Sequence, residues 1–314
     1  MKTPKLATVI SALVISGVFV FYFVPREKVS IEEFTQSITP QVHNTQASFI
    51  SAVNQPSYLP IRDWSILEPA VSSKAVVVYD VDNNKVLFQK NLKTKLPIAS
   101  ITKLATAIVV VDLVNPAELV TIPIAVTTTD DDSAPDFFVD DEIRAGDLLG
   151  VMLVKSSNDA AVTFEDHLAQ QGIDLLTEMN KRADRLGMTS TNFKDVSGLD
   201  DSGYSTVEDL ILLMKALDGY PQIEADLRRG SISFTSLDGR NQYNFSTTNQ
   251  LLNVVSDVQS GKTGFTEGAQ GAMILKVRPA DSEVTLISVV LGSPDRFGET
   301  QSLISWAQRA HRWK

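Results

Sequence analysis

The sequence predicts an α+β fold in which one sheet is assembled from both ends of the chain. Two observations support this prediction: strand-like segments lie near residues 74–90 and again after residue 270, whereas most segments between them have helical periodicity. The chain has 314 residues and is 43% hydrophobic, which is enough to bury a full core in one or two domains.

The first expected elements are a β-hairpin and a helix. Residues 74–81 and 85–90 are rich in β-branched and aromatic residues, and the turn residues Asp82-Asn83-Asn84 separate them. The apolar run that follows predicts a helix that opens just before Ser100 and continues to about Val114.

The later elements are predicted from periodicity, caps and turns. Ser205 and Glu208 fit a capping box at the start of one helix, and Asp238-Gly239 is typical of a hairpin turn. In chain order, we expect helices at 145–154, 159–170, 173–186 and 205–217, a hairpin over 231–245, strands at 272–277 and 283–291, and a closing helix at 300–313.

The N-terminal segment is predicted to be a membrane anchor or a signal peptide. Lys2 and Lys5 precede nineteen uncharged residues, 6–24, a length that crosses a bilayer as a helix. Bulky residues end this run, which favours an uncleaved anchor, whereas cleavage would release a secreted protein. Either interpretation places the rest of the chain on the extracytoplasmic side. The predicted organisation is an anchor or signal segment at 1–28, a juxtamembrane linker at 29–70 and a globular domain at 71–314.

Composition excludes several kinds of chemistry. The net charge of −10 argues against nucleic-acid binding, and the absence of cysteine excludes thiol catalysis, disulfides and cysteine-ligated zinc. The histidines have no metal-site spacing, so neither a metal nor a cofactor is expected. The acidic stretch 130–142 lacks the pattern of a calcium loop and is expected to be a solvated loop. The three histidines are His43, His167 and His311.

Ser100 and Lys103 form the first chemical motif, S-x-x-K. Residues i and i+3 of a helix share a face, so a neutral lysine amine there can take the proton of the serine hydroxyl. The helix N-terminus adds N–H groups that favour developing negative charge. Alone, this motif is common by chance and also fits a helix-capping serine beside a solvated lysine.

Two later motifs favour the catalytic interpretation. Ser156-Ser157-Asn158 places a hydroxyl and a carboxamide at the start of a helix, where they can also serve as simple caps. Lys262-Thr263-Gly264 is expected on a strand at a sheet edge. It combines a cation, a hydroxyl donor and a glycine, which permits another part of the backbone to approach closely. The three motifs are far more specific in this order than any of them alone.

In the order S-x-x-K, S-x-N, K-T-G, the chain resembles the penicillin-recognising serine D,D-peptidases, in particular the low-molecular-weight D-alanyl-D-alanine carboxypeptidases. The resemblance covers about residues 70–312 and includes Gly198-Leu199-Asp200 and Tyr204-Ser205-Thr206. It implies a β-lactamase/transpeptidase-like fold, with a five-stranded antiparallel sheet flanked by helices, a helical subdomain and a site between them. It makes residues 71–314 the expected catalytic domain.

The resemblance also implies catalytic roles. Ser100 attacks the carbonyl of a D-Ala-D-Ala bond in a peptidoglycan stem peptide, and Lys103 is its base. Lys262 helps to keep Lys103 neutral by like-charge repulsion. Ser156 carries a proton to the departing nitrogen, and Asn158 holds the peptide. β-Lactam antibiotics become covalent inhibitors by acylating the same serine.

Further residues are expected to bind the substrate. The resemblance implies that the backbone N–H groups of Ser100 and Phe265 form an oxyanion hole, with phenylalanine where the family often has histidine. It also implies that Lys262, Thr263 and Gly264 bind the end of the stem peptide that carries the free carboxylate. Arg296, ten residues before Trp306, matches an arginine with that role. Ser157 replaces a common glycine of the family, a small change.

Several alternatives stay open. A D,D-endopeptidase that cuts peptidoglycan crosslinks uses the same chemistry, and the acidic loop 130–142 is a candidate to shape its substrate side. A class A β-lactamase shares all three motifs but needs a deacylating glutamate, which 189–195 lacks, so β-lactams are expected to stay as slow acyl-enzymes. A β-lactam sensor domain is a non-enzymatic alternative.

Overall fold

The computed structural model describes residues 59–128, 134–279 and 284–313. The predicted anchor 6–24 and Asp130-Asp131-Asp132 of the acidic stretch lie outside these residues. Within the described ranges, none of the helices combines the length and the apolar character needed to cross a membrane.

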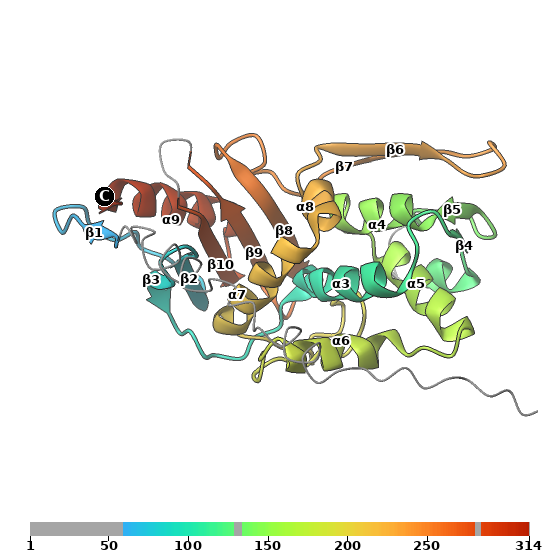
Figure 1. Cartoon of the computed structure of the whole chain (residues 1–314), viewed down its shortest axis with the longest axis horizontal. Helices are drawn as coiled ribbons and strands as arrows, with labels where there is room; N and C mark the ends of the chain where they lie inside the picture. The colour runs from blue at the N-terminus through green and yellow to red at the C-terminus, as the bar shows by residue number, and fades with distance from the viewer. Residues whose placement is uncertain (1–58, 129–133, 280–283, 314) are drawn as a thin grey trace, which may run out of the picture. The chain divides into compact units, whose positions relative to one another are not determined.

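The predicted sheet is confirmed: five antiparallel strands lie in the order β3-β2-β10-β9-β8, so both ends of the domain contribute to it (Figure 1). The hairpin β2–β3 comes from the N-terminal side, and β8, β9 and β10 from the C-terminal side. β8, which carries Lys262, is an edge strand. The strands span Ala75–Asp80 (β2), Lys85–Lys90 (β3), Val258–Thr266 (β8), Gln270–Val277 (β9) and Leu286–Ser293 (β10).

Both faces of the sheet are covered, which explains why β2 is buried throughout. Strand residues alternate between faces: Val76 and Val78 pack with Trp306 and other residues of α9 (Arg296–Ala310), whereas Val77 belongs to the larger core shared with the remaining helices. A strand between two helical layers needs apolar residues on both of its faces, and β2 has them from Ala75 to Tyr79, before the buried Asp80.

The helical part surrounds α3 (Lys103–Leu113), whose first eight residues are buried. This burial matches its sequence, which is apolar on nearly all sides and begins with one lysine. Helices α4 (Ala145–Val154), α5 (Asn158–Gln170) and α6 (Leu175–Arg185) pack around α3. Helix α7 (Val207–Ala216) packs on β2 and β10, and α8 (Pro221–Leu227) on β8 and α4.

Short elements complete the fold. Before α3 lies a 3₁₀ turn, η1 (Ala99–Thr102), and two-stranded sheets form from β4–β5 and from β6–β7. The predicted hairpin over 231–245 corresponds to β6–β7. The remaining elements are β4 (Leu119–Thr121), η2 (Ile124–Thr128), β5 (Glu142–Arg144), η3 (Leu217–Gly219), β6 (Ser231–Thr235) and β7 (Gln242–Ser246).

Two sequence expectations are wrong in detail. The helix predicted from Ser205 starts at Val207, and its cap is Thr206, which accepts from the N–H of Asp209; Ser205 instead pairs through its backbone with Leu96. The closing helix ends at Ala310, ahead of the predicted 313. There, β11 (His311–Arg312) pairs with β1 (Ile61–Arg62), from the range predicted as linker.

Candidate active site

Ser100 lies on a short, tightly wound segment between a strained residue and a helix. Ala99 has φ +46°, in the left-handed region that costs a residue with a Cβ about 1–2 kcal/mol. Gly198, with φ +84°, packs directly against Ala99: a Cβ at position 198 would collide with the Ala99 carbonyl. The loop that carries Gly198 thus fixes the backbone that presents Ser100.

The amine of Lys103 joins three parts of the chain. Its Nζ donates to Ser100 Oγ at 2.9 Å, to Asn158 Oδ1 at 2.6 Å and to the carbonyl of Ser197 at 2.8 Å. The residue is 0% exposed. A buried lysine needs such polar partners, because an amine without hydrogen bonds would be costly to remove from water. The predicted Ser100–Lys103 pair is therefore formed, and Asn158 is part of it.

Asp195 shapes the turn that supplies the Ser197 carbonyl. Its carboxylate accepts from the backbone N–H of Ser197 at 2.7 Å and from those of Gly198 and Asp200. A carboxylate that accepts several backbone N–H groups holds a tight turn in one conformation. Neither Asp195 nor Ser197 is among the site residues expected from the sequence.

The second motif lies at the junction of α4 and α5. Ser156 has φ +68°, which lets the chain reverse between the two helices. The Ser157 hydroxyl caps α5 by accepting from the N–H of Ala160 at 3.1 Å. Asn158 is the first residue of α5. Ser156 therefore reverses the chain, Ser157 caps α5, and Asn158 accepts a hydrogen bond from Lys103.

Lys262 lies behind Ser156. Its Nζ donates to Ser156 Oγ at 2.6 Å and to the carbonyl of Thr263 at 3.1 Å, and the residue is 1% exposed. Burial holds the pKa of Lys262 well below its usual value, and the positive charges of Lys103 and Arg296 lower it further. The two amines thus disfavour each other's protonation, and the pKa that is lowered here is that of Lys262; the expected effect of Lys262 on Lys103 stays a prediction.

Gly264 lets β8 approach the start of the Ser100 turn. A Cβ at this position would lie 3.0 Å from the backbone nitrogen of Ser100 and 3.0 Å from the Ile98 carbonyl, closer than real Cβ atoms usually come. The strand thus places the backbone at Gly264 beside the Ser100 N–H. The close approach expected from the K-T-G motif is present.

Thr263 has a side-chain partner, Thr248, which no sequence motif indicates. Its hydroxyl shares a 2.6 Å hydrogen bond with the hydroxyl of Thr248, and the N–H of Thr248 donates to the carbonyl of Val154 at 3.1 Å. Val154 ends α4, two residues before Ser156. Thr248 therefore connects the K-T-G strand to the helix that leads into the second motif.

Arg296 lies at the start of α9, on the β8 side of the site. Its guanidinium lies over the rings of Phe297 at 4.6 Å and Phe265 at 5.9 Å. Burial lowers the pKa of Arg296. The positive charge of Arg296 also lowers the pKa of Lys262, so Arg296 lies near the two lysines. With the contacts described above, the structure brings all nine predicted site residues to one region of the described chain. They are Ser100, Lys103, Ser156, Asn158, Lys262, Thr263, Gly264, Phe265 and Arg296.

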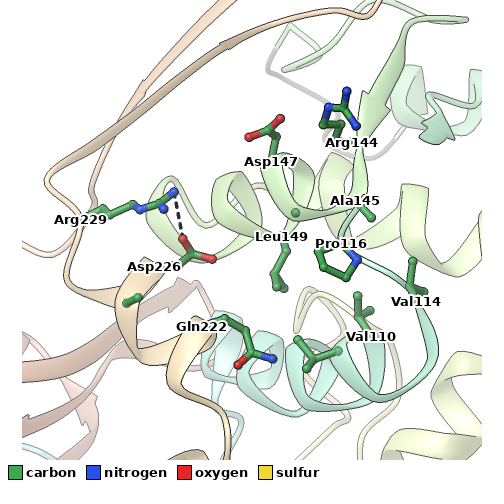
Figure 2. Close-up of a pocket in the computed structure, with 13 residues that line it drawn as sticks. Val110, Val114, Pro116, Arg144, Ala145, Asp147, Leu149, Gln222, Asp226 and Arg229 are labelled. Atoms are coloured by element: carbon green, nitrogen blue, oxygen red, sulfur yellow. Dashed lines mark ion pairs between the residues drawn. The ribbon is translucent and has the colours of Figure 1, made fainter. Parts of the chain in front are cut away.

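A separate pocket of about 430 Å³ lies between α3, α4 and α8 (Figure 2). It is lined by apolar side chains of α3 and α4 and by Asp226, which pairs with Arg229 at 3.0 Å. Asp226 is 7% exposed, and burial raises its pKa to about 6. None of the nine predicted site residues lines this pocket. Among the described residues, no cluster of three or more metal-ligating side chains is present.

Comparison with known proteins identifies the family. Residues 64–295 match the model of the family described as peptidase S11, D-alanyl-D-alanine carboxypeptidase. The chain is 30% identical over 262 residues to the D-alanyl-D-alanine carboxypeptidase DacC of Escherichia coli, covering 79% of this chain and 64% of DacC. It is also 30% identical over 250 residues to a D-alanyl-D-alanine endopeptidase of Pseudomonas aeruginosa, covering 79% of this chain and 78% of that protein.

A solved structure agrees with both fold and family. Penicillin-binding protein D2 of Listeria monocytogenes, in its cefotaxime-bound form, superposes with a TM-score of 0.66 and 30% identity, covering 77% of this chain and 99% of that chain. The fold predicted from the sequence is therefore confirmed, both by the five-stranded sheet and by this likeness. The chain belongs to the peptidase S11 family of D-alanyl-D-alanine carboxypeptidases.

Proposed function

We propose that this chain is a serine D,D-peptidase that removes the terminal D-alanine from peptidoglycan stem peptides through an acyl-enzyme on Ser100. The single observation that supports it best is the buried Lys103 amine, 2.9 Å from Ser100 Oγ. A structural lysine does not need a serine hydroxyl on a strained turn as its partner, whereas a serine nucleophile needs a base at hydrogen-bond distance.

In acylation, Ser100 Oγ attacks the carbonyl carbon of the penultimate D-alanine, and its proton passes to the neutral amine of Lys103. The tetrahedral oxyanion accepts from the backbone N–H groups of Ser100 and Phe265. The C–N bond then breaks, and the departing nitrogen takes a proton through Ser156. Water later attacks the ester carbonyl, releases the shortened peptide and restores the Ser100 hydroxyl.

Lys262 is suited to supply the proton that Ser156 passes on. It donates to Ser156 at 2.6 Å, and its lowered pKa makes it a better proton donor than an ordinary lysine. Lys103 and Lys262 thus act on opposite sides of the scissile bond: one accepts the proton of the nucleophile and the other replaces a proton on the leaving group.

The substrate ends in a free carboxylate, and three groups on the β8 side can receive it. Lys262 and Arg296 provide positive charge, and Thr263 provides a hydroxyl donor. Charge-assisted hydrogen bonds of this kind contribute roughly twice as much as neutral ones. Phe265 is 53% exposed beside Arg296 and is placed to contact the alanine methyl groups or the carboxylate end.

A D,D-endopeptidase is the second candidate, since relatives of equal identity carry both activities in their names. The contacts of Lys155, which precedes Ser156, give this candidate a structural basis. Lys155 forms an ion pair with Asp136, and the N–H of Asp136 donates to Asp159 at 2.6 Å. The C-terminal part of the acidic stretch is thus attached beside the residue that serves the leaving group, where a crosslinked second peptide has to fit.

We further propose that penicillins acylate Ser100 and leave slowly. The carboxylate nearest in sequence to the expected position of a deacylating glutamate is Asp195, and it accepts backbone N–H groups of its own turn. A carboxylate used in this way is poorly placed to activate water. Such slow release distinguishes a penicillin-binding peptidase from a class A β-lactamase.

The location follows from the same proposal. The substrate lies outside the cytoplasmic membrane, so the domain is proposed to act in the periplasm or cell-wall space, attached by residues 6–24 or secreted if that segment is cleaved.

The first test is to incubate the full chain with a fluorescent penicillin and measure the mass of the product. We expect one adduct on Ser100 that persists for many minutes, none in Ser100→Ala, and almost none in Lys103→Arg, because an arginine cannot act as a neutral base. Normal labelling of Lys103→Arg would contradict the role of Lys103. Rapid loss of the adduct with antibiotic turnover would indicate a β-lactamase.

The second test separates the two peptidase activities. Purified muropeptide pentapeptide monomers and D,D-crosslinked dimers are supplied at equal concentration, and the products are separated by chromatography and identified by mass. Release of D-alanine from the monomer supports the carboxypeptidase, whereas conversion of dimer to monomer supports the endopeptidase. Penicillin labelling without either product would favour a β-lactam sensor.

A further inference from the structure

A group of large apolar side chains is exposed where the described chain begins. Ile61, Trp64 and Leu67 are 58%, 79% and 86% exposed, and Leu59 is also exposed. We call these four residues the N-terminal apolar patch. Most large apolar side chains of the domain are buried, so four exposed ones within nine residues mark a surface that contacts something apolar.

The patch is held rigidly against the body of the domain. The guanidinium of Arg62 lies 4.8 Å from the ring of Trp64 and 4.6 Å from the ring of the buried Trp306, so it connects the exposed indole to α9. Arg62 also pairs with Glu68 at 3.4 Å. Trp64 is therefore supported from below while its outer face stays in solvent.

Cationic and polar groups border the patch. Ile61 pairs with Arg312 in the β1–β11 ladder, and paired residues point to the same side, so the exposed Arg312 lies beside Ile61. Leu67 lines an open groove of about 420 Å³ on α9 together with Arg309. The other residues of this groove are Pro69, Gln301, Ser302, Ser305 and Trp306. Apolar side chains next to arginines and hydroxyl groups fit a phospholipid surface, whose acyl chains and anionic headgroups lie side by side.

We propose that the N-terminal apolar patch, with Arg309 and Arg312, rests in the headgroup region of the membrane. Residues 1–58 directly precede the patch in the sequence and contain the predicted 19-residue span 6–24. Indole rings prefer the membrane interface, and arginines favour anionic lipid by about 1 kcal/mol each. The inference rests on the predicted anchor and is independent of the chemistry proposed for Ser100.

The contact would also fix the distance of the active site from the membrane. Helix α9 begins at Arg296, beside Phe265, and ends at Ala310, next to β11 and the patch. Figure 1 shows β1 beside the C-terminal end of α9. Its 15 residues span about 22 Å. The patch would therefore hold the site within about 22 Å of the headgroups, so that it meets stem peptides close to the membrane.

Tryptophan fluorescence tests this contact, since the chain has only Trp64, Trp306 and Trp313. The full chain carrying Trp313→Phe is reconstituted into vesicles of phosphatidylethanolamine and phosphatidylglycerol, with or without brominated acyl chains. We expect the brominated lipid to quench Trp64 emission. The matched control, Trp64→Phe in the same background, retains the buried Trp306 and should show no quenching.

Each other outcome overturns the proposal. If brominated lipid does not quench Trp64 but acrylamide in the aqueous phase does, Trp64 faces solvent. Trp64 that is protected from both quenchers is covered by protein, either residues 29–58 or a second copy. Replacing Arg309 and Arg312 by glutamine should reduce the quenching in anionic vesicles, and an unchanged value would contradict their role. Penicillin labelling of the same vesicles reports Ser100 separately, so failure of one proposal is distinguishable from failure of the other.

Discussion

The Nζ of Lys262 donates a 2.6 Å hydrogen bond to Oγ of Ser156, joining the third sequence motif to the second. Lys262 is 1% exposed and Ser156 is half-buried, and burial together with neighbouring positive charge holds the pKa of Lys262 well below its usual value. In the proposed mechanism, this contact gives the hydroxyl at the turn between the two helices a function, because it connects a buried amine to the side on which the leaving group would depart.

Removing the charge of Arg296 should raise the pKa of Lys262, because Arg296 is one of the cations that lower it. For Arg296→Met, the limb of the pH–rate profile that Lys262 controls is expected to move to higher pH. The kcat/KM for a peptide with a free terminal carboxylate should fall about tenfold or more, since a charged hydrogen bond contributes ~1.5–3 kcal/mol. The measurement is the pH dependence of kcat/KM. Arg228→Met, at an exposed position on the neighbouring α8 side, should change neither property.

Gly198 is expected to be essential for presenting Ser100. Gly198→Ala and Gly172→Ala both place a Cβ at positive φ, which costs about 1–2 kcal/mol. Only at position 198 does the new Cβ collide, with the carbonyl of Ala99, whereas position 172 has nothing within 4 Å. We expect Gly172→Ala to label with penicillin normally and Gly198→Ala to label ~100-fold more slowly, as for a nucleophile displaced by about 1 Å. Circular dichroism verifies folding, and equal labelling rates in folded variants would contradict the role of Gly198.

Thr248 is expected to position the hydroxyl of Thr263. Thr248→Val keeps the shape but leaves the buried Thr263 hydroxyl without this partner, at a cost of about 1–3 kcal/mol. Acylation by penicillin should slow about tenfold, and the effect should be much smaller for a penicillin methyl ester, which lacks the carboxylate. Thr248→Ser retains the hydroxyl and should restore the rate. If valine slows both antibiotics equally, Thr248 has a purely structural role.

The sequence was sufficient to predict most of the fold and the side chains of the site. Hydrophobic periodicity predicted four strands of the sheet and the principal helices, the K-T-G motif indicated the fifth strand, and the three motifs identified most of the residues that converge. What it lacked were contacts made by backbone atoms and the side-chain partner of Thr263, Thr248. The Ser197 carbonyl binds Lys103 with no side-chain signature, and the strain at Ala99 becomes visible only when Gly198 is placed against it.

Short-range sequence patterns also failed where two positions fit a helix start equally well and a tertiary contact decided which one caps the helix. Ser205 with Glu208 and Thr206 with Asp209 are both hydroxyl–carboxylate pairs three residues apart, so each fits a helix start. The backbone of Ser205 is held by Leu96, which leaves Thr206 as the cap. Similarly, the two-residue strands β1 and β11 have no periodicity to detect, and only their pairing defines them.

The pocket in Figure 2 predicts a measurable dependence of stability on pH. Burial raises the pKa of Asp226 from 3.8 to about 6, so the folded state favours the neutral acid. This contribution to stability is therefore complete below about pH 4 and is lost as the pH rises through about 6. Asp226→Asn mimics the neutral acid at every pH, and its partner Arg229 is half exposed and tolerates the loss of the ion pair.

We therefore expect Asp226→Asn to be about as stable as the parent protein at pH 4 and more stable, by about 1–2 kcal/mol, at pH 8. Urea unfolding of both proteins at several pH values measures the difference. Asp238→Asn is a matched control, since the pKa of that exposed carboxyl is lowered to about 2, and its removal should instead reduce stability at neutral pH. A stability difference that does not change between pH 4 and pH 8 would mean that Asp226 stays ionised in the folded protein, and that its ion pair with Arg229 outweighs the cost of burial.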